Sequence, residues 1–110
     1  MEANEYQKQA MRTCSITDDR KRQLYHGVLG LTSEAGEVSG ILQKIYQGHD
    51  HNIDHLVKEC GDCLWMISEI LQAVNVSLED CMTANIAKLR ARYPDGFDHD
   101  KSLHRKPGDI

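Results

Sequence analysis

The sequence predicts an all-α protein, an antiparallel helical bundle of about four helices that we expect oligomerisation to complete. Proline occurs only at Pro94 and Pro107, so the chain before Pro94 lacks the strongest helix breaker. Apolar residues recur at alternating intervals of four and three, which is typical of one helix face. The 110 residues suffice for one domain, yet so small a chain would gain buried surface by associating with a second copy.

The N-terminal half predicts a short helix over residues 3–12 and a long helix that ends near Gln47. Residues 17–19, Thr-Asp-Asp, offer N-caps for the long helix. Gly27 and Gly30 are expected to bend it. Its apolar stripe consists of Leu24, Val28, Leu31, Ala35, Val38, Leu42 and Ile45.

A third helix follows the short connection GHDHN at 48–52. It repeats the four-three spacing at Leu56, Cys60, Cys63, Ile67, Ile70 and Val74. Two long helices joined by so short a loop are expected to form an antiparallel hairpin.

A fourth helix is expected to begin after Ser77, which forms an acidic capping box with Asp80, and to stop at Tyr93. It completes a predicted domain over residues 1–97. The polar segment 98–110 has no hydrophobic periodicity, so we expect a tail that is flexible or ordered only by a partner subunit.

Two acid pairs stand at equivalent positions on the two long helices. They belong to SEAGE at 33–37 and ECGD at 59–62, and the acids are Glu34, Glu37, Glu59 and Asp62. The expected hairpin brings all four within about 10 Å along its axis. Four carboxylates this close repel one another unless cations neutralise them. An all-oxygen ligand set suits Mg²⁺, or Mn²⁺, better than Zn²⁺, so the sequence predicts a metal site here.

An interior glycine separates the acids of each pair, Gly36 in one and Gly61 in the other. Such a glycine costs a helix about 1 kcal/mol relative to alanine. Without a Cβ, neighbouring backbone or a ligand can approach the acids closely. A single acid pair is common on solvated helix faces, whereas two pairs with this glycine, on helices that should pack together, favour metal binding.

The fourth helix carries Asn85, Lys88 and Arg92 along one flank of its apolar stripe. Their spacing alone fits an ordinary solvated edge equally well. A basic seam beside an acidic metal site is, however, the combination that phosphoryl chemistry needs, because metal ions bridge phosphates while Lys and Arg balance the remaining charge.

The stretches at 33–37, 59–62 and 85–97 (NIAKLRARYPDGF) together resemble the MazG-like family of all-α nucleoside triphosphate pyrophosphohydrolases. The family signature is EExxE followed by ExxD, and the resemblance covers residues 24–97. Ser33 stands where the first Glu of the signature would be, which leaves open how the attacking water is activated.

The resemblance implies hydrolysis of nucleoside triphosphates, of which we expect deoxynucleoside or modified ones, between the α and β phosphates. The products are a monophosphate and pyrophosphate. It also implies Mg²⁺ held by the four acids and a homodimer or homotetramer. Lys88 and Arg92 would contact phosphates, and Asn85 would position the nucleotide. Of the acids, Glu37 is the expected general base and Glu59 is expected to be essential for turnover.

Other interpretations stay open. The enzyme could be restricted to one substrate such as dUTP or dCTP, or the chain could be a non-catalytic helical dimerisation module that binds metal or nucleotide. Cys60 and Cys63 form a CxxC pair near several histidines, but small core residues explain them more simply than zinc. Trp65 is expected to pack in a subunit interface, with stacking on a nucleobase as the alternative.

Composition excludes several classes of protein and partner. The net charge of −4 argues against a non-specific nucleic-acid binder. No apolar run reaches the roughly 20 residues of a membrane span, and the N-terminus lacks the pattern of a signal peptide. We therefore expect no membrane partner, a cytoplasmic location and free thiols at the four cysteines.

Overall fold

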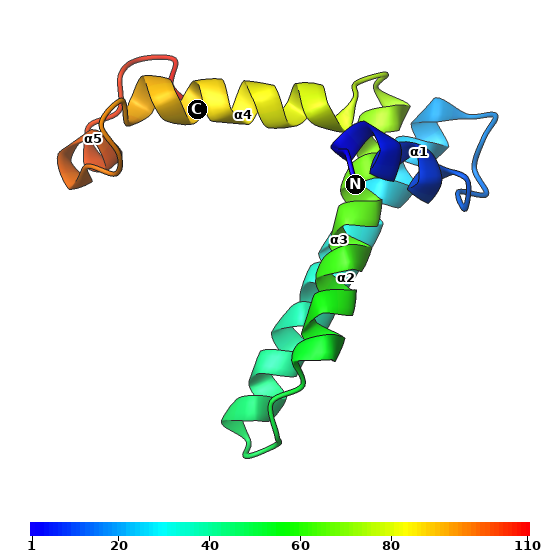
Figure 1. Ribbon diagram of the computed structural model, residues 1–110. Helices are drawn as coiled ribbons and strands as arrows, with labels where there is room; N and C mark the ends of the chain where they lie inside the picture. Colours follow the sequence, from blue (N-terminus) through cyan, green and yellow to red (C-terminus); the bar gives the residue numbers. More distant parts are fainter. The chain divides into compact units, whose positions relative to one another are not determined.

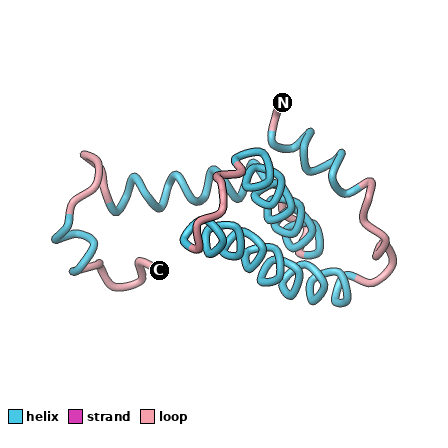
Figure 2. Tube along the Cα trace, turned by 90° about the horizontal axis from the view of Figure 1, so that it is seen from below, coloured by secondary structure: helices cyan, strands magenta, loops and turns pink.

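The computed structural model describes residues 1–110 and confirms the all-α fold, with five helices and no strand (Figure 2). The helices are α1 (Ala3–Met11), α2 (Arg20–Tyr46), α3 (Ile53–Ala73), α4 (Leu78–Arg92) and α5 (His99–Leu103). No helix is long and apolar enough to cross a membrane. The chain divides into two compact units, residues 1–78 and residues 79–110.

The first unit is built on an antiparallel pair, α2 and α3, which lie side by side along their length (Figure 1). The Asp19 carboxylate caps α2 by accepting the backbone N–H of Arg22 at 3.1 Å. The Asn52 side chain caps α3 in the same way with the N–H of His55 at 3.0 Å. Gly48, with φ of +95°, lets the chain turn between the two helices. The predicted hairpin is confirmed.

The face by which α2 meets α3 coincides only in part with the predicted apolar stripe. Val28 and Leu42 of that stripe are 47% and 56% exposed, whereas Gln23, Gly27 and Ile41 are buried. Leu24, Leu31, Val38 and Ile45 are only half-buried. The helix is therefore rotated so that smaller and more polar residues face α3, and part of its apolar surface points elsewhere.

Glycines explain this rotation. A Cβ at Gly27 would lie 2.8 Å from Cγ1 of Ile70, and a Cβ at Gly30 would overlap the Sδ atom of Met66. These two glycines therefore allow α2 to approach α3 closely. The sequence had predicted that they would bend the helix. By contrast, a Cβ at Gly36 or at Gly61 would meet nothing within 4 Å. No neighbour within this chain requires those two glycines.

Helix α1 packs against α3. The indole N–H of Trp65 lies 3.0 Å from the Ala10 carbonyl oxygen and 2.8 Å from Oγ1 of Thr13, and donates to both. At the far end of α3, the Gln7 side chain accepts the backbone N–H of Leu78 at 2.9 Å. Trp65 therefore packs against α1 and the turn after it within the chain, where packing in a subunit interface was expected.

The second unit contains α4 and an ordered tail. The Asp98 side chain caps α5 by accepting the N–H of Lys101 at 3.0 Å. The ring centroids of Tyr93 and Phe97 lie 5.4 Å apart across the turn that leaves α4. The expectation of a tail without structure of its own is wrong, because capping and local contacts compensate for its lack of hydrophobic periodicity.

Candidate metal centre

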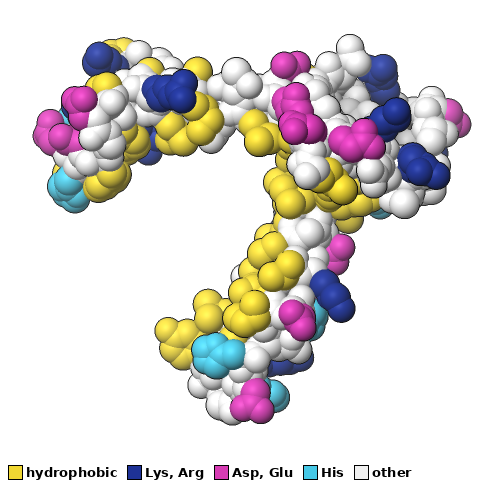
Figure 3. All heavy atoms as spheres, in the orientation of Figure 1, with side chains coloured by type: hydrophobic (Ala, Val, Ile, Leu, Met, Phe, Trp, Pro, Cys, Tyr) yellow, Lys and Arg dark blue, Asp and Glu magenta, His cyan; other side chains and the backbone are white.

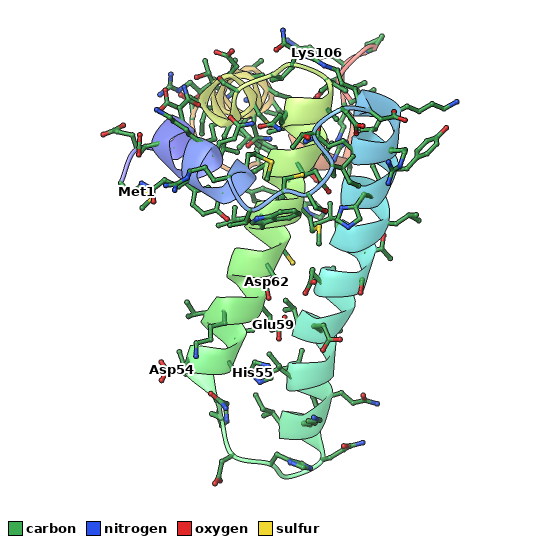
Figure 4. All side chains as sticks on the ribbon, turned by 90° about the vertical axis from the view of Figure 1, so that its right-hand side faces the viewer. Met1, Asp54, His55, Glu59, Asp62 and Lys106 are labelled. Carbon is green, nitrogen blue, oxygen red and sulfur yellow. The ribbon has the colours of Figure 1, made fainter.

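Three acids from the two hairpin helices form a cluster. Glu34 of α2 meets Glu59 and Asp62 of α3, and one oxygen from each lies within 4.8 Å of the others. Figure 4 shows Glu59 and Asp62 on the side of α3 that faces α2. Glu34 and Glu59 are half-buried and Asp62 is exposed. The structure thus brings together three of the four acids predicted as metal ligands.

The fourth predicted ligand, Glu37, is exposed and lies outside this cluster. It stands one helical turn beyond Glu34 on α2. It is still near enough for its charge to act on Glu34. The prediction of Glu37 as a fourth member of the cluster is therefore not met by the structure.

Negative charge accumulates at the cluster, where acidic side chains outnumber the one nearby histidine, His55. Partial burial raises the pKa of Glu34, and the charges of Asp62, Glu59 and Glu37 raise it further. Burial and the Asp62 charge likewise raise the pKa of Tyr6, whose hydroxyl lies 3.4 Å from the Gly61 carbonyl. A bound cation would relieve this repulsion.

Glu59 provides the best test of whether a metal ion fits. Its Oε1 accepts a hydrogen bond from Nε2 of His55 at 3.0 Å, and because a carboxylate can only accept, the imidazole must donate. Its Oε2 is buried and has no hydrogen-bond partner, although the side chain as a whole is 14% exposed. A buried, unpartnered carboxylate oxygen is costly unless a cation pairs with it. The all-oxygen donor set fits Mg²⁺ or Mn²⁺.

The cysteines lie outside this donor set. All four are free, Cys60 is exposed and Cys63 is half-buried. No cysteine, and neither His49 nor His51, belongs to the cluster. His55 takes part only through its hydrogen bond to Glu59, by which it orients that carboxylate.

The predicted phosphate-binding residues all lie on α4, in the second unit. Asn85 and Lys88 are exposed, and Arg92 is half-buried. The Arg92 guanidinium is already engaged, since Nε and Nη2 donate to the two carboxylate oxygens of Asp109 at 2.8 and 2.7 Å. Sequence reasoning missed Asp109, because it placed that residue in a flexible tail.

Sequence reasoning also missed a buried polar network around Glu69, whose side chain is 0% exposed. Nδ1 of His26 lies 2.5 Å from Oε1 of Glu69, and Sγ of Cys14 donates to Oε2 at 3.0 Å. Gln23 completes the network through a contact of 3.7 Å with the Cys14 sulfur. Burial and the hydrogen bond to Glu69 raise the pKa of Cys14, which keeps this thiol protonated at neutral pH.

A signal for Glu69 was present in the sequence. Glu59, Asp62, Met66 and Glu69 follow one another at intervals of three and four, so they share one face of α3. Following this series two steps past Asp62, through Met66, places Glu69 on the face that meets α2.

Comparison with known proteins agrees with this geometry. The MazG nucleotide pyrophosphohydrolase domain matches residues 26–97, a range that includes the three clustered acids and all of α4. The Gene 37 protein of Mycobacterium phage L5 is 31% identical over 74 residues, which cover 63% of this chain and 65% of the phage protein. The match therefore spans just under two thirds of that relative. No solved structure matches the chain. Because the domain match covers more than half of its length, the chain belongs to the MazG nucleotide pyrophosphohydrolase domain family.

Proposed function

We propose that this protein hydrolyses nucleoside triphosphates, with deoxynucleoside or modified triphosphates as the favoured class, to a monophosphate and pyrophosphate with the help of Mg²⁺. The observation that carries the proposal is the cluster of Glu34, Glu59 and Asp62 with its buried, unpartnered oxygen. Membership of a nucleotide pyrophosphohydrolase family supports the class of reaction.

The acids divide into two roles in this proposal. Glu34, Glu59 and Asp62 hold the cation, and His55 keeps the Glu59 carboxylate in place through its Nε2–H. Bound Mg²⁺ would supply positive charge against the phosphates and make a nearby water more acidic. Glu37, beside the cluster, accepts the proton that the attacking water releases.

The residues of α4 bind the substrate in this proposal. Lys88 and Arg92 contact the phosphates, where their charge offsets the negative charge that develops during hydrolysis. Asn85 positions the nucleotide through its side-chain amide, which can both donate and accept hydrogen bonds.

Pyrophosphate should be the product when the protein is incubated with Mg²⁺ and a panel of canonical and modified triphosphates. Pyrophosphate and orthophosphate are measured separately, and a parallel reaction contains EDTA. In water enriched in oxygen-18, the label should enter the monophosphate, because attack at the α-phosphorus places the new oxygen there. Orthophosphate as the sole inorganic product would reject α–β cleavage, and a complete lack of turnover would favour the non-catalytic binding module.

We further propose that the protein is a homodimer or homotetramer. The hairpin leaves large hydrophobic side chains exposed, as Figure 3 shows on one of its faces. They include Leu29, Leu42, Val57 and Leu64. The rotation of α2 that turns Leu42 away from α3 is understandable if a second copy covers this surface.

Sedimentation equilibrium should therefore give a mass at least twice that of one chain. Leu42→Glu should shift the population toward the monomer, because it places a charge in the covered surface. Gln43→Glu, at the neighbouring exposed position, is the matched control and should leave the mass unchanged. A wild-type protein that sediments as a monomer at all concentrations would contradict this proposal.

A further inference from the structure

A cleft of about 470 Å³ lies in the second unit between α4 and the segment 101–110. Its volume falls within the range of small-molecule sites. The only acidic side chain in its wall is that of Asp109, which stands against five cationic ones: Lys88, Arg92, Lys101, Arg105 and Lys106. The cleft therefore has the size and the charge of a site for a small anion.

The carboxylate of Asp109 is bound to one of these cations. Its two oxygens accept from Nε and Nη2 of Arg92 at 2.8 and 2.7 Å, and the side chains of Arg92 and Asp109 are only 10% and 18% exposed. The hydrogen bonds from Arg92, with the charges of Arg92, Arg105 and Lys88, hold the pKa of Asp109 below its usual range. Three cations thus act on a single carboxylate.

A phosphate group would satisfy these cations better than Asp109 does. Two parallel N–H donors are the geometry by which arginine binds phosphate as well as carboxylate. A pyrophosphate group also carries more charge and more acceptor oxygens than one carboxylate. Arg92 lies within the residues 26–97 that match the family, whereas Asp109 lies outside them. The contact between the two is therefore made by a residue that the family match does not include.

We propose that this cleft binds the phosphate groups of the substrate or of the pyrophosphate product, and that Asp109 is an internal competitor that must leave Arg92 before they bind. The proposal rests on the phosphate-binding role proposed for Lys88 and Arg92. Competition of this kind raises the apparent dissociation constant in inverse proportion to the fraction of molecules in which Arg92 is free. The tail segment 98–110 then regulates access to the phosphate-binding residues.

Calorimetric titration of the full chain with inorganic pyrophosphate tests the competition. The titration contains EDTA, so that no divalent ion can recruit pyrophosphate to the acid cluster. Asp109→Asn should bind pyrophosphate about tenfold more tightly than the wild type if the tail engages Arg92 in about nine molecules of ten. Asp100→Asn is the control, because it removes the same charge from an exposed position of the same tail that contacts only His104. Its affinity should change by less than about twofold.

A variant that lacks residues 108–110 removes Asp109 without altering α5 and should also bind more tightly. Arg92→Ala should lose most of the binding. Equal tightening by Asp109→Asn and Asp100→Asn would overturn the proposal, since net charge alone would then explain the effect. Unchanged affinity in both Asp109 variants would overturn it as well.

Turnover assays, combined with these titrations, separate this proposal from the proposed function. Suppose that the wild type releases pyrophosphate from triphosphates but Asp109→Asn does not change the affinity for pyrophosphate. Competition by Asp109 is then rejected, and the proposed function stands. If Asp109→Asn binds pyrophosphate more tightly but the wild type hydrolyses no triphosphate, the proposed function is rejected and competition by Asp109 stands. A non-hydrolysable α,β-imido triphosphate that displaces pyrophosphate assigns the cleft to the substrate, whereas binding of pyrophosphate alone assigns it to the product.

Discussion

Glu59→Gln should lower the rate of pyrophosphate release by about three orders of magnitude, a loss typical of removing a group that stabilises charge in a transition state. Glutamine keeps the size of the side chain and an oxygen that can accept from His55. It removes the negative charge, however, and its amide can place N–H donors where the unpartnered Oε2 now lies. The cluster of Glu34, Glu59 and Asp62 then loses one of its three negative charges.

Glu59→Gln should be more stable than the wild type in the absence of metal, although it should be less active. Partial burial raises the pKa of Glu34 and the charges of Asp62, Glu59 and Glu37 raise it further, so the ionised acids repel one another at the cluster. Removing one charge relieves that repulsion, so in EDTA the variant should unfold at a higher temperature than the wild type. Added Mg²⁺ should raise the unfolding temperature of the wild type and have little effect on the variant.

Pyrophosphate release and thermal unfolding followed by circular dichroism measure both effects in the same samples. Asp54→Asn is the matched control, because Asp54 is an exposed acid on the same helix that does not belong to the cluster. It should retain activity and the response to Mg²⁺. If Glu59→Gln releases pyrophosphate as fast as Asp54→Asn does, Glu59 is not a metal ligand.

Glu69→Gln should lower the free energy of unfolding by about 2 kcal/mol, the usual contribution of a hydrogen bond to a charged group. The Glu69 carboxylate accepts from His26 through one oxygen and from the Cys14 thiol through the other. An amide is neutral and accepts through its oxygen alone, so its NH₂ group faces either the Cys14 thiol or Nδ1 of His26 in the tautomer that accepts. In both arrangements a charge-assisted hydrogen bond is lost at a fully buried side chain.

Thermal unfolding should show this loss as a decrease of about 10 °C in the midpoint for a domain of this size. Glu5→Gln provides the comparison, because Glu5 is an exposed acid whose side chain bonds only to Gln9. Its midpoint should stay within about 2 °C of the wild type. Equal midpoints for the two variants would show that the buried network adds nothing to stability.

The helices and the hairpin were predictable because local signals specify them. Asp19, Asn52 and Gly48 mark helix ends through their own side chain or backbone conformation. The acid cluster was predictable for a related reason, since a hairpin with a short loop fixes the height of each residue along the paired helices.

The rotation of α2 was not predictable from its apolar stripe. We expected the most hydrophobic face to meet α3, but Gly27 and Gly30 let the two backbones approach on another face. That rotation turns Glu34 toward α3 and leaves Val28 and Leu42 exposed. A sequence shows how apolar a face is, but it does not show which of two partners that face will meet.

The contacts of Glu69 and Asp109 were missed because each depends on residues distant in the sequence. Glu69 is paired with His26 and Cys14, which come from other segments of the first unit. Asp109 has no periodic pattern around it and gains its position only from Arg92. Pairs of residues distant in the sequence can be identified only in the folded chain, whereas helix periodicity can be recognised in any short stretch of sequence.

All three clustered acids lie on two helices that follow each other directly in the chain, and this arrangement has a consequence for folding kinetics. Contacts between neighbouring elements form fast, because little chain entropy is lost in closing a short loop. The acids are therefore brought together early, when their repulsion opposes closure of the hairpin. A divalent cation that pairs with them would speed this step, so the rate of folding would depend on the cation as well as on the sequence.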